Sequence, residues 1–343
     1  MGNRPLVHVD KRVSLVFEEF IRLAHHCGLP RTDLDYLHGQ GPHAQRVLVD
    51  GNARLTQFTG SSVVGEHLAS VTRGKVKLED AGFDWKVLGP DARAEDVPHV
   101  AWQCDQDAYA ASGQKCSATS FLAMHENWRN VGLVEALREK ASQRSLTNLT
   151  VGPLLSWTDE RLRAHVDAVC SLAGAKILFG GRLLRDVDPQ GTKRVPTCYG
   201  LLEPTAVFVP LSTLAGDPTA ARLATQELFG PFQIVTEYHH ENLDALLHLL
   251  EGLSHHLTAA VVSRDPDFTS RVLMRTTNGT TYAGIRARTT GAPQNHWFGP
   301  GSDPRGAGIG TIEAIRSVWS YHREIISDVG PTWTDADQKF IQS

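Results

Sequence analysis

The most informative stretch of the chain is Asp105-Gln106-Asp107-Ala108-Tyr109-Ala110-Ala111-Ser112-Gly113-Gln114-Lys115-Cys116-Ser117-Ala118, which surrounds one cysteine with small residues and places it early in a predicted helix. A thiol on a glycine-containing turn, close to the free N–H groups of a helix start, has its thiolate form favoured. The small neighbours leave room for a carbonyl carbon to reach the sulfur. The sequence therefore predicts that Cys116 is a nucleophile.

On both sides of this stretch, strand-like and helix-like patterns alternate. Apolar residues at helical spacing predict helices over residues 13–24, 158–173 and 243–250. Strands are expected at residues 5–9, 46–49, 54–58, 176–179, 206–209, 232–235 and 258–262. This alternation predicts an α/β fold with a parallel, doubly wound sheet. The polar residues 331–343 are expected to form an exposed tail.

Composition excludes several functional classes. The chain has 343 residues, 41% of them hydrophobic, which is enough for a large core and for two or three domains. Lys and Arg number 34 against 38 Asp and Glu, with no long basic cluster, so nucleic-acid binding is not expected. No apolar stretch is long enough to span a membrane, and the N-terminus has no secretory or transit pattern.

Cysteines and histidines give no metal-binding pattern. The five cysteines are scattered, odd in number and without CxxC spacing, which indicates a reducing compartment. Adjacent histidine pairs point to different sides of a helix or strand, so none of them forms a ligand set alone. No metal site is expected.

A second candidate site follows the strand predicted at 54–58. Residues 58–65, Phe-Thr-Gly-Ser-Ser-Val-Val-Gly, have the pattern of a strand, a glycine turn and a helix start. Backbone N–H groups and the helix dipole at such a turn favour a phosphate. Gly60 and Ser61 are therefore candidate cofactor-binding residues, although the turn alone is a weak signal.

Gly113-Gln114-Lys115-Cys116-Ser117-Ala118 resembles the active-site cysteine motif of the aldehyde dehydrogenase superfamily. The wider stretch 101–128 resembles the plant-type delta-1-pyrroline-5-carboxylate dehydrogenases within it. The resemblance implies an aldehyde dehydrogenase-like α/β fold with a partial Rossmann-like cofactor domain at 1–88 and an α/β catalytic domain at 89–308. It further implies a return and oligomerisation strand at 309–330, ahead of the tail at 331–343.

Two further motifs match the family in the same order. Glu79, in Lys77-Leu78-Glu79-Asp80-Ala81-Gly82, could be an ordinary surface carboxylate, but the resemblance makes it the general base that activates water. Glu227, in Glu-Leu-Phe-Gly-Pro, could be a solvated helix-end residue. The resemblance implies that Glu227 holds the nicotinamide ribose of NAD and that Phe229 packs near the ring.

The substrate pocket is expected at Ser117 and at a late glycine-rich loop. Small residues there leave N–H groups free for a carboxylate, and by itself the loop could be a plain surface turn. The resemblance implies that Ser117, Gly291 and Ala292 bind the substrate carboxylate, and that Phe298 packs on its aliphatic part. Arg286 and Arg288 flank this loop and could add positive potential.

The resemblance implies NAD-dependent oxidation of L-glutamate 5-semialdehyde, in equilibrium with pyrroline-5-carboxylate, to glutamate. It starts at Gly2, inside the family's cofactor domain, so the family's first strands and its oxyanion-hole asparagine lie outside the match. The alternatives are a truncated homologue that serves only as an interaction subunit and, more remotely, a cysteine hydrolase that pairs Cys116 with a histidine. A homo-oligomer in the mitochondrial matrix is implied, with the cytoplasm as the alternative compartment.

Overall fold

The computed structural model describes residues 2–80, 82–290 and 295–327. Its largest feature is a seven-stranded sheet in the order β11-β10-β5-β6-β9-β8-β7. All neighbouring strands are parallel except β7 and β8, which are antiparallel. The strands are β5 (Asp84–Leu88), β6 (Thr119–His125), β7 (Lys176–Phe179), β8 (Thr205–Phe208), β9 (Phe232–Tyr238), β10 (Thr258–Val262) and β11 (Thr280–Ala283).

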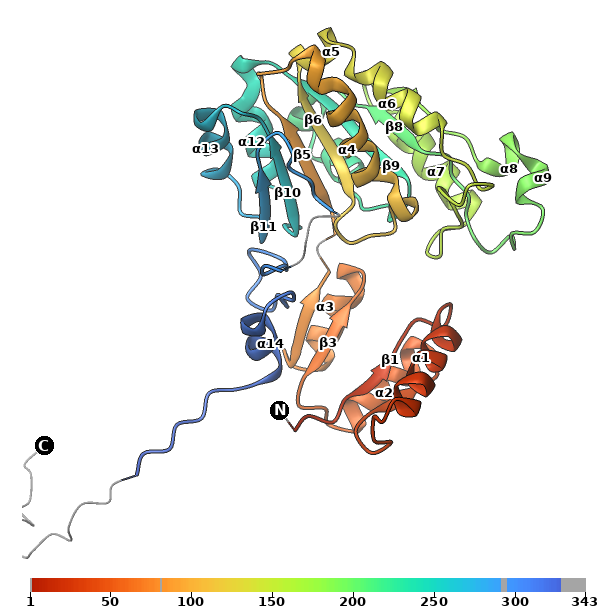
Figure 1. Ribbon diagram of the computed structural model, residues 1–343, viewed down its shortest axis with the longest axis vertical. Helices are drawn as coiled ribbons and strands as arrows, with labels where there is room; N and C mark the ends of the chain where they lie inside the picture. The colour runs from red at the N-terminus through yellow and green to blue at the C-terminus, as the bar shows by residue number, and fades with distance from the viewer. Residues whose placement is uncertain (1, 81, 291–294, 328–343) are drawn as a thin grey trace, which may run out of the picture.

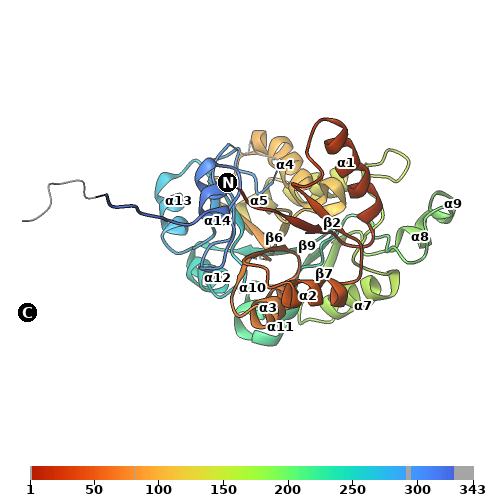
Figure 2. The same cartoon turned by 90° about the horizontal axis from the view of Figure 1, so that it is seen from below.

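Helices cover both faces of this sheet, so the larger body has three layers (Figures 1 and 2). Phe121 and Ala123 of β6 join one buried cluster, whereas Leu122 and Met124 join the other, as the alternation of side chains along a strand requires. The helices are α4 (Val97–Tyr109), α5 (Glu126–Asn130), α6 (Leu133–Ser142), α7 (Asp159–Cys170), α8 (Leu184–Val187), α9 (Pro189–Thr192), α10 (Leu211–Gly216), α11 (Pro218–Ala224), α12 (Leu243–Glu251) and α13 (Pro266–Leu273), with short 3-10 turns at η1 (Ala94–Asp96), η2 (Ala110–Gly113) and η3 (His240–Asn242).

The N-terminal residues form a smaller body below the sheet (Figure 1). It contains two parallel two-stranded sheets, β1-β2 and β3-β4. Its elements are β1 (Leu6–His8), α1 (Ser14–His26), β2 (Asp35–Leu37), α2 (Gly41–Asp50), β3 (Thr56–Thr59), α3 (Ser62–Val71) and β4 (Val76–Glu79). The chain returns to this body near its end, where Leu78 of β4 pairs with the backbone of Arg305 and Ala307. Helix α14 (Ile312–Trp319) follows.

The strand expected at 46–49 is wrong, because these residues lie in α2. Pro42 stands in the first turn of α2, where the missing N–H of proline is tolerated and its fixed φ suits a helix. The β-branched side chains of Val47 and Val49 favour a strand, but both are exposed and pack against no sheet. The strand that pairs with β1 comes earlier, at β2.

The bridging strand expected at 309–330 is also wrong where the structure describes it. Residues 312–319 form α14, and residues 320–327 belong to neither helix nor strand. Thr311 caps α14 by accepting a hydrogen bond from the backbone N–H of Ala314 at 3.1 Å. Ala314 and Val318, four residues apart, are the buried positions, so helical spacing outweighs β-propensity. The predicted tail at 331–343 lies outside the described residues.

The division of the chain after residue 88 cuts through a sheet. Strand β5 pairs with β6 and β10 and is buried at every residue, so it belongs to the larger body. The chain passes between the two bodies after β4. In the part of the chain that the structure describes, no helix has the length and apolar character that a membrane crossing requires.

Candidate functional site

Cys116 lies in the turn that connects η2 to β6, not in a helix as the sequence analysis expected. Its side chain is half-buried and packs against the buried Phe298 and Leu257. The turn closes with a hydrogen bond from the backbone N–H of Ala118 to the carbonyl of Lys115 at 3.0 Å. The thiol therefore sits at the amino end of a central strand, on a tight turn.

The backbone before Cys116 is held in an unusual conformation. Ala111, Ser112 and Gly113 have φ of 54°, 58° and 65°, which side-chain-bearing residues rarely adopt. The amide of Gln114 donates to the carbonyl of Pro153 at 3.0 Å and accepts from the backbone N–H of Leu155 at 2.9 Å. Such strain persists only where neighbouring contacts enforce it. The loop that carries Cys116 is therefore fixed in place.

A close backbone contact brings the segment around Glu227 to this loop. A Cβ added at Gly113 would lie 2.1 Å from the carbonyl oxygen of Gly230, so only glycine fits there. A Cβ added at Gly82 would likewise lie 2.2 Å from Oε1 of Glu227. The Glu227 carboxylate thus lies against the chain that leads from β4 to β5.

Glu79 is the last residue of β4, and its carbonyl accepts a hydrogen bond from the N–H of Gly60 at 3.2 Å. The carboxyl ends of the parallel strands β3 and β4 therefore bring Glu79 and the Gly60 turn to one edge. The Glu79 side chain is largely buried, and its Oε1 has no hydrogen-bond partner.

Glu79 and Cys116 lie close enough to shift each other's pKa. Burial raises the pKa of the Cys116 thiol, and the charge of Glu79 and a hydrogen bond to it raise this pKa further. Burial also raises the pKa of Glu79, while its hydrogen bond with Cys116 lowers it. The expectation that the turn favours the thiolate is wrong for this state, because burial and the carboxylate outweigh the backbone N–H. The thiol therefore needs a base to become a thiolate, and Glu79 is a carboxylate close to it.

Two more carboxyl groups surround this pair. Burial raises the pKa of Glu227 to about 7, with a further contribution from the charge of Glu79. Burial also raises the pKa of Asp84 well above its usual value, although Oδ1 accepts hydrogen bonds from the backbone N–H and Oγ1 of Thr258, both at 2.6 Å. Like charges close together disfavour one another, so part of this cluster is protonated near neutral pH.

Comparison with known proteins identifies the family to which the chain belongs. Residues 1–302 match the sequence profile of the Aldehyde dehydrogenase family. The chain belongs to the aldehyde dehydrogenase family. It is 54% identical over 331 residues to the mitochondrial delta-1-pyrroline-5-carboxylate dehydrogenase 12A1 of Arabidopsis thaliana, covering 96% of this chain and 58% of that protein.

Solved structures confirm the aldehyde dehydrogenase fold. A mutant of the 1-pyrroline-5-carboxylate dehydrogenase of Thermus thermophilus matches with a TM-score of 0.75 at 22% identity, over 92% of this chain and 59% of that one. The betaine aldehyde dehydrogenase of Staphylococcus aureus, solved in complex with NAD+, matches with a TM-score of 0.73 at 20% identity, over 92% and 60%. The chain thus spans somewhat under two thirds of the length of these relatives.

The residues predicted to bind the cofactor lie on two separate turns. Gly60 and Ser61 are exposed, and Ser61 is the N-cap of α3 without using its side chain as the cap. The N–H groups of that turn are suited to a phosphate. Glu227 and Phe229 are partly buried in the turn that touches the Cys116 loop. A carboxylate such as Glu227 can accept hydrogen bonds from ribose hydroxyls through both of its oxygens when it is ionised.

The structure places two of the predicted substrate residues beside the thiol. Ser117 follows Cys116 in the same turn and is buried, and Phe298 packs against Cys116. Phe298 is held by backbone hydrogen bonds in both directions with Ile309, at 2.9 Å and 2.7 Å. Gly291 and Ala292 lie outside the described residues.

Sequence reasoning missed several charged residues next to this aldehyde dehydrogenase site. Asp84 was not singled out, and neither were Lys86 and Asp107, which form a buried ion pair. The available signal was a lysine within the apolar strand Asp84–Leu88. No group of three or more His, Cys, Asp or Glu side chains suited to a metal occurs among the residues that the structure describes.

The raised pKa of Glu227 predicts a pH-dependent stability. The usual pKa of glutamate is 4.5 and the folded value is about 7, so between these values the folded state binds more protons than the unfolded state. The free energy of unfolding should therefore fall as pH rises through this window, by roughly 3 kcal/mol from Glu227. Urea unfolding at a series of pH values measures this loss.

The matched variant is Glu227→Gln, which has no proton to lose at this position. Its stability should fall less steeply over the same pH range, since it lacks the contribution of Glu227 while all other titrating groups are unchanged. An equally steep loss in both proteins would show that the Glu227 pKa is not raised.

Proposed function

We propose that this chain carries the catalytic machinery of an NAD-dependent dehydrogenase that oxidises L-glutamate 5-semialdehyde, formed from pyrroline-5-carboxylate, to glutamate. The proposal rests on the proximity of Glu79, at the end of β4, to Cys116, before β6, where each group shifts the pKa of the other. A buried thiol beside a buried carboxylate is what a covalent oxidation followed by hydrolysis requires. The similarity to the Arabidopsis enzyme supports the choice of substrate.

In the first step, Glu79 accepts the proton of the Cys116 thiol and the thiolate adds to the aldehyde carbon. Because burial raises the pKa of both groups, the proton moves between two sites that the protein shifts in the same direction. The product is a hemithioacetal oxyanion attached to Cys116, and Glu79 releases the thiol proton to solvent. Ser117 and Phe298 lie beside the carbon chain of the substrate in this proposal.

When bound, NAD would accept the hydride that leaves the hemithioacetal carbon. Gly60 and Ser61 would hold its phosphates, while Glu227 would accept hydrogen bonds from its ribose and Phe229 would pack near its ring. The remaining group on Cys116 is a thioester. Glu79 then removes a proton from water, the hydroxide adds to the thioester carbon, and the carbon–sulfur bond breaks to release glutamate and return the thiol.

The direct test measures NADH formation by the purified chain with pyrroline-5-carboxylate as substrate. We expect NADH to form, with NADPH formation from NADP as the comparison that sets cofactor preference. A chain that is folded by circular dichroism but forms neither product would contradict the proposal. That result would favour an interaction subunit without its own chemistry.

We further propose that the protein is a homo-oligomer of the mitochondrial matrix. Tyr321, Ile325 and Ile326 are strongly exposed apolar residues after α14, and such surfaces commonly become buried between subunits. The mitochondrial name of the Arabidopsis relative supports the compartment. Light scattering of the purified chain tests the assembly, and a monomer at all concentrations would contradict it.

A further inference from the structure

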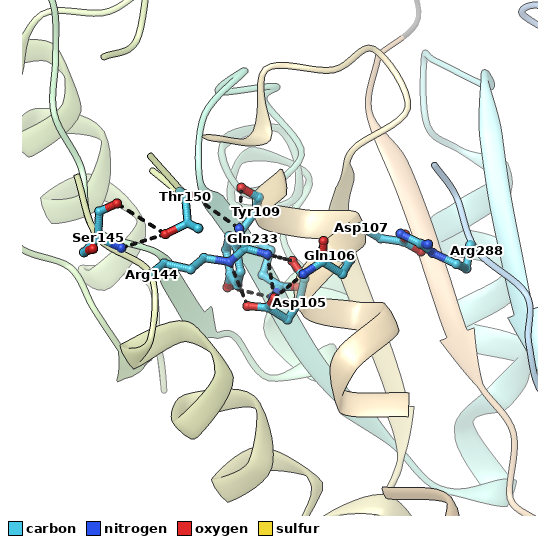
Figure 3. A network of polar contacts seen from close by, with 9 residues as sticks. All are labelled: Asp105, Gln106, Asp107, Tyr109, Arg144, Ser145, Thr150, Gln233 and Arg288. Atoms are coloured by element: carbon cyan, nitrogen blue, oxygen red, sulfur yellow. Dashed lines mark hydrogen bonds and ion pairs between the residues drawn. The ribbon is translucent and has the colours of Figure 1, made fainter. Parts of the chain in front are cut away.

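A buried carboxylate on α4 joins three separate parts of the larger body, namely α4, β5 and the segment 288–289. Asp107 accepts hydrogen bonds from Nζ of Lys86 at 2.7 Å, from Nε of Arg288 at 2.7 Å and from the backbone N–H of Thr289 at 3.0 Å. The side chains of Lys86 and Asp107 are 0% exposed. Figure 3 shows Arg288 reaching Asp107 on one side of α4, while Arg144 reaches Asp105 on the other.

The burial of this cluster makes its geometry rigid. Removing charges from water is strongly unfavourable unless they are paired and hydrogen-bonded, so a fully buried Lys86 and Asp107 must keep their contact. Charge-assisted hydrogen bonds are shorter and stronger than neutral ones. The backbone N–H of Thr289 donates to the same carboxylate, and the position of Thr289 is therefore set by the ion pair.

Thr289 in turn contacts the residue that begins β6, next to the turn that contains Cys116. Its Oγ1 lies 2.7 Å from Oγ1 of Thr119, and both residues are buried. Thr119 begins β6, directly after the turn that contains Cys116 and Ser117. Thr290, also buried, follows Thr289 and precedes the glycine-rich stretch in the sequence. Asp107 is therefore connected through Thr289 to Thr119, at the start of the strand that follows Cys116.

The charge of the cluster also differs from that of the rest of the site. Lys86, Asp107 and Arg288 together supply two cations and one anion. Glu79 and Glu227, by contrast, are carboxyl groups with raised pKa values. A negatively charged group on the substrate is therefore attracted to the Thr289 end of the site and disfavoured at the Glu79 end.

We infer that Asp107 is a positioning residue that makes the site selective for aldehydes bearing a carboxylate, because it fixes Thr289 and Thr290 relative to Cys116 and Ser117. This inference deepens the proposed function and rests on it for the identity of the substrate. Asp107 itself touches neither the thiol nor the substrate in this account. Asp107 acts by fixing the position of Thr289 relative to Cys116.

The first measurement needs no turnover. Iodoacetamide alkylates Cys116, and mass spectrometry of the peptide that contains Cys116 follows the rate with and without added glutamate. Glutamate should slow alkylation of the wild-type chain, since it places its carboxylates where the product lies. Asp107→Asn should raise the glutamate concentration needed for half-maximal protection by about tenfold or more. This corresponds to a tenfold weaker binding of glutamate.

The second variant, Thr289→Val, keeps the ion pair and removes only the contact with Thr119, so it remains informative if Asp107→Asn does not fold. It should also weaken glutamate protection. The matched control is Asp105→Asn, which breaks the buried pair of Asp105 with Arg144, 2.6 Å long, on the same helix. Because that pair does not contact Thr289, the control should keep wild-type protection.

Steady-state kinetics separates positioning from general damage. The KM for pyrroline-5-carboxylate should rise in Asp107→Asn and Thr289→Val, whereas kcat and KM for pentanal, which has no carboxylate, should change little. Equal losses for both substrates would overturn the inference, as would unchanged glutamate protection in both variants or absent protection in the wild type. If the wild type forms no NADH but glutamate protection is lost only in the two variants, the proposed oxidation fails and the positioning role stands.

Discussion

Replacing Cys116 with alanine is expected to abolish NADH formation, with a loss of roughly 10⁴- to 10⁶-fold in kcat. The thiol is the group that forms the covalent bond to the aldehyde carbon, and no water molecule can replace it in hydride release. Its half-buried place against Phe298, next to Glu79, is specific to this cysteine. The measurement is NADH absorbance with pyrroline-5-carboxylate at saturating concentration.

The matched control is Cys104→Ala. Cys104 lies on the buried face of α4, and burial raises its pKa to about 11, so it is an unreactive core residue. This variant should keep its kcat within severalfold while losing some stability from the small cavity. Substantial NADH formation by Cys116→Ala, or a comparable loss in Cys104→Ala, would show that the nucleophile has been assigned wrongly.

Local sequence signals predicted the parts of this site that depend on nearby residues. The glycine turn at Gly60 and Ser61 begins α3, because Ser61 adopts the extended conformation of an N-cap before the helix. The small residues around Cys116 form a tight turn, since Gly113 must approach Gly230 closely. In both cases a few adjacent residues determine the backbone.

The errors arose where packing decides between alternatives. Val47 and Val49 suggested a strand, but no neighbouring strand was available and the residues form part of α2. The family resemblance suggested a strand within 309–330 as well. Residues 312–319 instead form α14, which Thr311 caps and which buries Ala314 and Val318, four residues apart. Propensity is weak evidence where an exposed helix and an edge strand both bury few residues.

The electrostatics of the site could not be predicted from the sequence, because they depend on residues that are far apart along the chain. The turn around Cys116 indicated a lowered pKa, whereas the folded structure surrounds the thiol with Glu79 and Asp84 and raises it. The network of Asp107 likewise joins Lys86 and Arg288, which no local pattern connects. The roles of Glu79 and Glu227 came from the family resemblance, not from their spacing.

Replacing Glu79 with glutamine is expected to lower steady-state NADH formation by about 10² to 10⁴, the usual contribution of a general base. Without the carboxylate, water attacks the thioester slowly and Cys116 stays acylated. Because loss of the carboxylate also lowers the pKa of Cys116, solvent can take the thiol proton in the variant. Rapid mixing should therefore show a first turnover followed by a slow steady state, and intact-protein mass spectrometry should detect the acylated chain. A steady-state rate equal to that of the wild type would remove Glu79 from the mechanism.

The matched control for Glu79→Gln is Asp80→Asn. Asp80 is the next residue in the chain, but its carboxylate faces α3, where a Cβ added at Gly65 would lie 3.0 Å from Oδ2. This change removes one nearby negative charge without removing the base. Its steady-state rate should stay within severalfold of the wild type, and no acylated chain should accumulate.

Glu79→Gln also predicts a change in the thiol with a definite sign. The charge of Glu79 and its hydrogen bond both raise the pKa of Cys116, so their removal should lower that pKa and speed alkylation of Cys116 at neutral pH. The wild-type enzyme should lose turnover as pH falls through the raised pKa of Glu79, because a protonated carboxyl group cannot accept a proton. The variant should lack that pH dependence. A thiol that becomes more reactive while hydrolysis becomes slower separates the two roles of one carboxylate, since a general structural defect would impair both.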